Sequence, residues 1–229
     1  MLWDSPAFEE SSIRQIARDG VPIIDLLPGT PDGISVVTAD REDAGYHATR
    51  HLIEQGHRRI GLIGDTLTRP KTTLQKLAGY RRALEGARMK YDEALVQNVT
   101  EFGFEGGRVG FNTLQKRCPD VTGLFCINDA IALGAIEAAK DLGRACPADL
   151  SVVGFGDSAE GSHWRPKLTT FSLSPDRVAA RAIQLVLEHR AHPELPPEAI
   201  LIPEDLLLRE STGPRRGTTG PQDNRTTGP

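Results

Sequence analysis

The sequence predicts an α/β protein built on parallel sheets. Short apolar runs alternate with helix-like segments along most of its 229 residues. This alternation favours strands joined by right-handed crossover helices, with helices covering both faces of each sheet. The segment from Asp40 to Gly64 shows the pattern most plainly, because a capped helix, a glycine turn and a buried strand follow one another there.

Each part of that segment has a local physical reason. Asp40 stands where a helix N-cap is expected, and a capping oxygen satisfies the free N–H groups of the first turn. Apolar positions then recur every four residues, at Ala44, Ala48 and Leu52. Gly56 follows as the glycine that ends the helix. The run from Ile60 to Ile63 is typical of a strand buried on both faces.

The other elements follow from the same patterns. Strands are expected at 21–26, 34–38, 60–63, 96–100, 123–127, 151–155 and 168–171. Helices are expected at 9–19, 42–55, 74–88, 105–116, 129–142 and 176–190. The 129–142 segment is apolar almost all round, which predicts a well-buried helix. Ile200 to Arg209 carries Pro203 within an apolar run and suits an edge strand. Residues 212–229 repeat a Thr-Gly-Pro theme with nothing to bury, which predicts a disordered tail.

Composition excludes several classes of protein. The net charge is −4 and the pI about 5.9, so the chain shows no basic excess for nucleic-acid binding. Three cysteines without short spacing support neither a disulfide framework nor a zinc knuckle. No apolar stretch approaches the length of a membrane span, and the first residues do not read as a signal peptide. We therefore expect a cytoplasmic protein with no membrane partner.

The usual signatures of catalysis are missing from the sequence. It contains no Gly-rich dinucleotide loop, no phosphate-binding P-loop and no Gly-x-Ser-x-Gly elbow. His47 and His51 lie four apart on one helix face, as two metal ligands would, but the Glu of the zincin pattern is replaced by Ala48. A polar helix face is the favoured interpretation. The sequence predicts no enzyme, no cofactor and no metal.

An ordered set of motifs resembles one known family. They lie at 20–24, 40–64, 77–84, 128–135, 149–157 and 166–170. The most specific is Asn128-Asp129-Ala-Ile-Ala-Leu-Gly134, a strand end that runs into a helix. In order and spacing these segments resemble the lactose-repressor (LacI/GalR) family of bacterial transcription regulators. The resemblance covers nearly all of the chain from about Ile13 to Glu210.

The resemblance implies a two-lobed fold of the periplasmic-binding-protein-like type. Two parallel-sheet lobes would be joined by three crossover segments, with a small molecule held between them. It places residues 1–57 and 172–197 in the first lobe, and 58–171 and 198–211 in the second. It also implies that the first lobe is incomplete here, and that the family's helix-turn-helix domain is absent from this chain.

The resemblance also implies a set of ligand-binding residues. Asn128 would hydrogen-bond a polar ligand while Asp129 caps the following helix; in the alternative, one of them is merely a cap. Asp157 would be the second of two acids that the family often carries, and Gly156 stands in the place of the first. Both expectations follow from the family's pattern rather than from composition.

Four further candidates come from the same resemblance. Lys76 stands where the family has an arginine, and an ammonium does not replace a guanidinium fork. A solvated helix residue is an equally weighted alternative for Lys76. Phe102 falls where the family often places a ring against the ligand, and Phe104 and Trp164 are nearby candidates. Core packing is the alternative for each ring, and Trp164 also suits the rim of a cleft.

These expectations combine into one function. The chain would be the effector-sensing and dimerising core of a LacI/GalR-type regulator, with a small polar, sugar-like metabolite as its effector. Its partners would be that metabolite and a second copy of the chain, and operator DNA only through the absent helix-turn-helix domain. The alternative is the solute-binding protein of a transporter, which shares the two-lobed fold.

Overall fold

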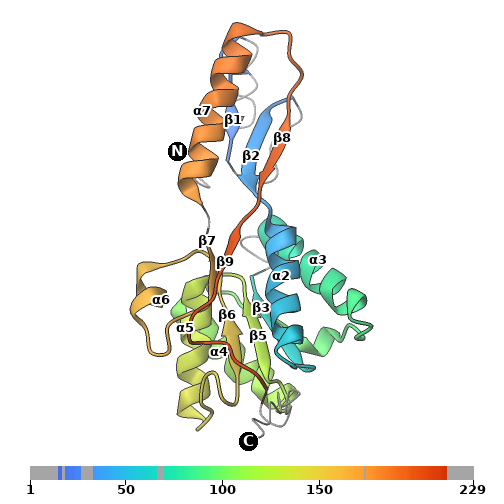
Figure 1. Cartoon of the computed structure of the whole chain (residues 1–229), viewed down its shortest axis with the longest axis vertical. Coiled ribbons are helices and arrows are strands. Elements are labelled where there is room, and N and C mark those ends of the chain that lie inside the picture. The colour runs from blue at the N-terminus through green and yellow to red at the C-terminus, as the bar shows by residue number, and fades with distance from the viewer. Residues whose placement is uncertain (1–14, 17–18, 27–32, 66–69, 173, 216–229) are drawn as a thin grey trace, which may run out of the picture. The chain divides into compact units, whose positions relative to one another are not determined.

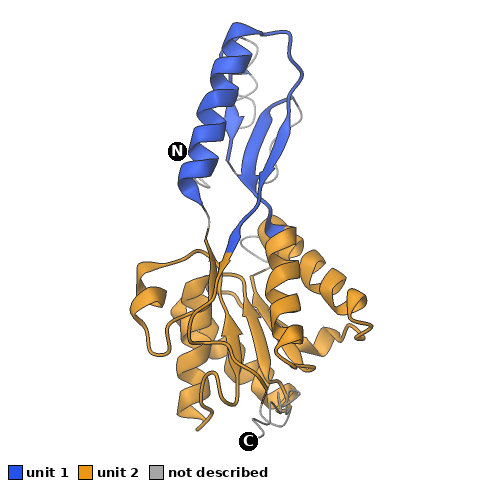
Figure 2. Ribbon diagram, viewed as in Figure 1, with its two compact units in different colours: residues 1–41, 173–205 blue, residues 42–172, 206–229 orange. Residues whose placement is uncertain are grey.

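The computed structural model confirms an α/β fold with parallel sheets. It describes residues 15–16, 19–26, 33–65, 70–172 and 174–215. The chain forms two compact units, each assembled from separate stretches of sequence (Figure 2). Unit 1 comprises residues 1–41 and 173–205, and unit 2 comprises residues 42–172 and 206–229.

Unit 2 is built on a four-stranded parallel sheet. The strands are β3 (Ile60–Gly64), β4 (Val96–Asn98), β5 (Gly123–Cys126) and β6 (Ser151–Val153). Their order in the sheet is β4-β3-β5-β6. Every residue of β3, β5 and β6 is buried, as the uninterrupted apolar runs predict for strands covered on both faces.

Helices cover both faces of this sheet (Figure 1). On one side lie α2 (Arg41–Glu54) and α3 (Pro70–Gly86), and on the other lie α4 (Phe104–Arg117) and α5 (Asp129–Asp141). Unit 2 also contains two short elements, the 3-10 helix η1 (Glu93–Leu95) and the helix α6 (Ala159–His163). The sequence patterns did not predict η1 or α6, because segments of three and five residues carry no periodic signal.

Glycines let the helices of each pair approach closely. A Cβ on Gly107 of α4 would collide with the carbonyl oxygen of Ile131, and one on Gly134 of α5 with that of Phe104. The helices α2 and α3 pack in the same way. Gly45 of α2 lies against the backbone of Lys76, and Gly79 of α3 lies against the backbone of Glu42. Each helix pair therefore packs backbone to backbone and forms a dense layer over the sheet.

Unit 1 is smaller. Its parallel sheet has the order β1-β2-β8, with strands β1 (Ile24–Asp25), β2 (Ser35–Ala39) and β8 (Ala199–Ile202). The helix α7 (Pro175–Ala191) belongs to the same unit. The core that these elements share consists of Val37, Ala182 and Leu185.

Two strands link the parts of the chain at the unit boundaries. These are β7 (Thr170–Ser172) and β9 (Asp205–Leu207), which pair with each other. The edge strand expected from Ile200 to Arg209 is confirmed for β8, which lies at the edge of its sheet, but it does not run on to Arg209. The strand is interrupted at Pro203, whose ring and missing N–H end the ladder, and the chain resumes as β9.

The unit boundaries differ from those that the resemblance implied. Residues 42–57 pack in unit 2, because Ala44, Ala48 and Leu52 of α2 join its core. Residues 198–205 belong to unit 1, where β8 pairs with β2. The expected helix at 9–19 lies mostly outside the described residues, as do residues 216–229 of the expected tail.

Candidate functional site

The strand order of unit 2 points to one edge of its sheet. From β3 the chain moves outward to β4, then crosses back to β5 on the other side of β3, so the winding direction reverses between β3 and β5. Ligands of open α/β sheets bind outside the carboxyl ends of the strands at such a switch point. The carboxyl ends of β3 and β5 lead into Asp65 and Asn128. We call the strand ends and the residues that follow β3, β5 and β6 the effector edge.

Asn128 is the N-cap of α5. Its Oδ1 accepts a hydrogen bond from the backbone N–H of Ile131 at 2.7 Å, with the extended backbone of a cap residue. The side chain is half-buried, and its Nδ2 amide donates to none of the described residues. One end of the side chain is thus fixed by the helix, and the other end keeps two donors for a ligand.

Asp129 does not cap the helix, and the expected division of roles is wrong on this point. The carboxylate is 3% exposed. Its Oδ1 accepts from the Thr170 hydroxyl at 2.5 Å, and its Oδ2 accepts from the Ser158 backbone N–H at 2.6 Å. A buried carboxylate is tolerable only when its oxygens are bonded in this way. Asp129 therefore ties the start of α5 to the loop after β6 and to β7.

Lys76 is buried, so the solvated alternative is wrong. Its side chain projects from α3 and is 4% exposed. The ammonium donates to the carbonyl oxygen of Ile127 at 2.9 Å and lies 3.6 Å from the centre of the Phe155 ring. These contacts place a cation at the carboxyl end of β5, next to Asn128 and against the aromatic residue that follows β6.

Asp157 is engaged by a basic residue distant in sequence. Its Oδ1 accepts from the Arg209 guanidinium at 2.5 Å, and both side chains are largely shielded from solvent. Arg209 also donates to the carbonyl oxygen of Leu168 at 2.9 Å. Gly156 precedes Asp157 with φ +129°, a conformation that a side chain rarely adopts. An acid at position 156 would therefore be strained on this backbone.

The aromatic candidates divide into two groups. The rings of Phe104 and Trp164 form a tilted pair with centroids 6.0 Å apart. Trp164 is half-buried and packs against the core of unit 2. Phe102 is 41% exposed in the loop between β4 and α4. The structure thus brings Phe104 and Trp164 together, while Phe102 keeps an accessible ring.

The sequence analysis missed Asp65 at this edge and Arg209, which bonds to Asp157. Asp65 is fully buried directly after β3, and the Thr73 hydroxyl donates to its carbonyl oxygen at 2.5 Å. A signal for Asp65 was present, since a polar residue ends this apolar strand just as Asn128 ends the next one. No local pattern pointed to Arg209, because its partner Asp157 lies 52 residues away.

Two other features lie away from the effector edge. His47 and His51 have separate partners, Asp43 at 3.4 Å and the Thr212 hydroxyl at 3.0 Å.

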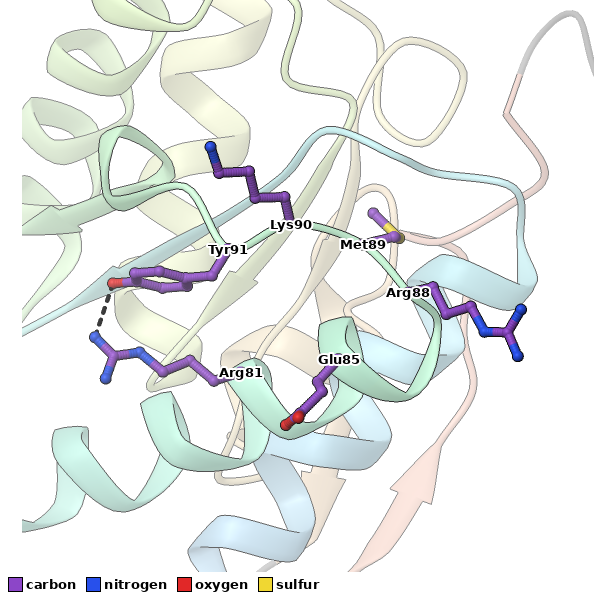
Figure 3. Close-up of a pocket in the computed structure, with 6 residues that line it drawn as sticks. All are labelled: Arg81, Glu85, Arg88, Met89, Lys90 and Tyr91. Atoms are coloured by element: carbon purple, nitrogen blue, oxygen red, sulfur yellow. Dashed lines mark hydrogen bonds between the residues drawn. The ribbon is translucent and has the colours of Figure 1, made fainter.

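An open hollow between the end of α3 and the following loop is lined by Arg81, Glu85, Arg88, Met89, Lys90 and Tyr91 (Figure 3). Arg81 stacks on the Tyr91 ring, whereas Arg88 extends away from the other side chains. The hollow lacks the convergent polar groups of a specific ligand site.

Comparison with known proteins decides the family. A model described as the periplasmic binding protein-like domain matches residues 49–212, which is most of the chain. The chain belongs to this family. None of the helices among the described residues is long and apolar enough to cross a membrane.

The relatives of this family member are transcriptional regulators of the LacI type. It is 32% identical over 206 residues to the HTH-type transcriptional regulator CelR of Thermobifida fusca, covering 86% of this chain and 58% of that protein. A solved complex of a CelR regulator with cellobiose matches with 30% identity and a TM-score of 0.77, covering 87% and 62% of the two chains. A LacI family regulator of Enterococcus faecium with bound ribose matches with 25% identity and a TM-score of 0.80, covering 92% and 78%. The chain thus spans little more than half the length of the curated CelR relative.

Proposed function

We propose that this chain is the effector-sensing core of a LacI-type transcriptional regulator, acting in the cytoplasm as a homodimer. The effector is a small polar, sugar-like metabolite, and the protein binds it without converting it. The supporting observation is the Asn128 amide, which lies half-exposed at the switch point of unit 2 with its donors unused by the described residues. The relatives are regulators rather than enzymes or transporter components, which favours this function over a solute-binding protein.

The geometry gives each candidate residue a place in effector binding. Asn128 donates to ligand hydroxyl or carbonyl oxygens. Lys76 keeps a positive charge behind the Ile127 carbonyl and favours electron-rich ligand groups at the end of β5. Phe102 and Trp164 offer ring faces on which the C–H face of a sugar can stack. Asp157 shapes the loop through its contact with Arg209 rather than as a free acceptor.

The response to effector is a shift between two conformations. A ligand that binds one arrangement of the units better than another changes their populations by its difference in affinity. In a whole regulator this shift would alter DNA binding, a coupling between two sites. Operator contact falls to a helix-turn-helix segment outside the two units, since the chain carries a net charge of −4.

A thermal-shift screen with a matched Asn128 pair tests the proposal. The probes are cellobiose, ribose, nucleosides and sugar acids. A ligand at a hundred times its Kd stabilises the protein by about 2.7 kcal/mol. Asn128→Asp keeps the capping oxygen but loses the amide donors, so we expect the fold to persist and the ligand-induced shift to disappear. Asn128→Ala loses the cap as well and serves as the comparison, at a further cost of about 1 kcal/mol.

Two outcomes would contradict the proposal. An undiminished shift in Asn128→Asp would remove Asn128 from the site. If the purified protein converted any probe into a product, the chain would be an enzyme and the proposed regulator function would be wrong.

A further inference from the structure

The chain passes between the two units three times. The passages follow residues 41, 172 and 205. The second passage comes directly after β7, and the third lies within β9. Because β7 and β9 pair with each other, the two later passages form one structural element at the boundary of unit 2.

Asp129 fixes β7 to the effector edge. Its two carboxylate oxygens accept from the Thr170 hydroxyl in β7 and from the Ser158 N–H in the loop after β6. The space around the carboxylate is filled, since a Cβ on Gly154 would collide with Oδ1. Asp129 is the first residue of α5 and immediately follows Asn128, so the two residues move with the same helix turn.

Asp157 makes the corresponding connection to β9. Its carboxylate accepts from Arg209, two residues beyond the end of β9. The Arg209 backbone N–H donates to the Thr169 hydroxyl at 3.0 Å, which joins this segment to the residue before β7. The Thr170 hydroxyl lies between the two anchors, because it donates to Asp129 and lies 3.5 Å from the Asp157 backbone N–H.

Backbone hydrogen bonds also join the loop after β6 to β7. Gly154 N–H donates to the carbonyl oxygen of Thr169 at 2.9 Å, and Gly156 N–H donates to that of Phe171 at 2.8 Å. The loop that follows β6 is therefore bonded to β7 along its length. A displacement of this loop or of the first turn of α5 is passed to β7 through these backbone hydrogen bonds and through the short, charge-assisted bonds of Asp129.

We propose that Asp129 and Asp157 are positioning residues that couple the effector edge to the two later passages between the units. The proposal rests on the proposed effector function. A ligand held by Asn128 displaces the start of α5, and Asp129 passes this displacement to Thr170 in β7. The Asp157–Arg209 pair makes the segment after β9 move together with the same loop. Coupling of this kind needs a physical element that both sites bias, and the β7–β9 pair provides it.

Thr170→Val is the first test, because it removes the shared hydroxyl while keeping shape and leaving both carboxylates in place. The measurement is the distance distribution between spin labels at Gln184→Cys in α7 and Lys116→Cys in α4, in a Cys146→Ser background; both labelled positions are exposed. Without ligand, we expect Thr170→Val to broaden the distribution relative to its parent. An unchanged distribution would overturn the proposal.

The controls separate positioning from general destabilisation. Thr122→Val removes a comparable hydroxyl at the opposite end of the sheet, where Thr122 bonds to His57, and should leave the distribution unchanged. Arg209→Lys tests the second anchor by keeping the charge but losing the planar fork, and should broaden the distribution as well. If Thr170→Val fails to fold, Arg209→Lys decides the question with the same two outcomes.

Adding cellobiose or ribose distinguishes the coupling from the effector function itself. Allosteric couplings typically change affinity about 5- to 150-fold. We expect a bound sugar to narrow the distance distribution of the parent. Thr170→Val should still bind the sugar, with a Kd that changes by no more than this factor, but without the narrowing. If Thr170→Val abolished both sugar binding and the narrowing, Thr170 would serve binding itself and the coupling proposal would be overturned. If neither sugar binds the parent, these sugars are rejected as effectors, while the ligand-free comparison still decides the anchors.

Discussion

The two units share a parallel α/β design but differ in how deeply their strands are buried. In unit 2 every residue of β3, β5 and β6 is buried between two helix layers. In unit 1 the strand β8 alternates between exposed and half-buried residues, and α7 leaves Ile183 and Leu187 more than half exposed. Burial of apolar surface is the main stabilising contribution to folding, so unit 2 carries most of the stability within the described residues.

The largest expected effect compares one leucine from each unit. Leu124 in β5 and Leu185 in α7 are both fully buried, so changing each to Ala removes the same atoms. Leu→Ala substitutions in cores cost about 2–5 kcal/mol, depending on how far the site collapses. We expect the loss of unfolding free energy to lie near the upper end of this range for Leu124→Ala and near its lower end for Leu185→Ala. Urea unfolding measures both, and equal costs would refute the contrast between the units.

The second prediction tests whether the density of unit 2 depends on its close helix pairs. Gly107→Ala places a methyl group against the backbone of Ile131, where α4 and α5 meet. Overpacking of this kind costs about 1–3 kcal/mol. Gly86→Ala is the matched control, since nothing lies within 4 Å of the added Cβ. Gly86→Ala should stabilise the protein slightly, by about 0.4–1 kcal/mol, because alanine lowers the conformational entropy of the unfolded chain. A neutral Gly107→Ala in calorimetry would show that the layers are looser than the structure indicates.

The smallest expected effect is a pH dependence specific to unit 2. Burial lowers the pKa of His57 below 6.5, and the nearby positive charge of Arg215 acts in the same direction. The unfolded chain then binds more protons than the folded one below pH 6.5, so stability is full above that pH and falls as the pH drops through it. Each unit of pKa separation is worth about 1.4 kcal/mol.

His57→Gln provides the check on this assignment. The ring nitrogens of His57 lie 3.1 Å from the Thr122 hydroxyl and 3.2 Å from the Gly213 carbonyl oxygen, and a glutamine amide keeps one such bond without titrating. Thermal unfolding followed across pH should show a shallower slope for the variant just below pH 6.5. Identical slopes would assign the acid sensitivity to other groups, such as His51, whose pKa is also lowered by burial.

Local patterns were sufficient for most of the fold of unit 2. Uninterrupted apolar runs identified β3 and β5, and helical spacing identified α2, α4 and α5, because buried elements repeat a simple periodicity. The split of Ile200–Arg209 into β8 and β9 needed more than the pattern, since Pro203 could end a strand or sit at its edge.

The candidate site was less predictable because its contacts are not local. The sequence places Asn128 and Asp129 at a strand end but does not say which of them caps α5. That choice depends on Thr170, which provides a buried donor for Asp129 from 41 residues away. For Lys76 the sequence left a ligand contact and a solvated position equally weighted, and its burial follows only from the packing of its side chain against Phe155.

The path of the chain after β9 has a practical consequence. Thr212 to Arg215 run along the end of unit 2 where the strands begin, held by Ser151 and by the carbonyl oxygen of Gln55. Arg215 therefore lies on the side of unit 2 opposite to Asn128. A fluorophore, affinity handle or surface tether attached there offers a way to immobilise the protein without obstructing its strand-end residues.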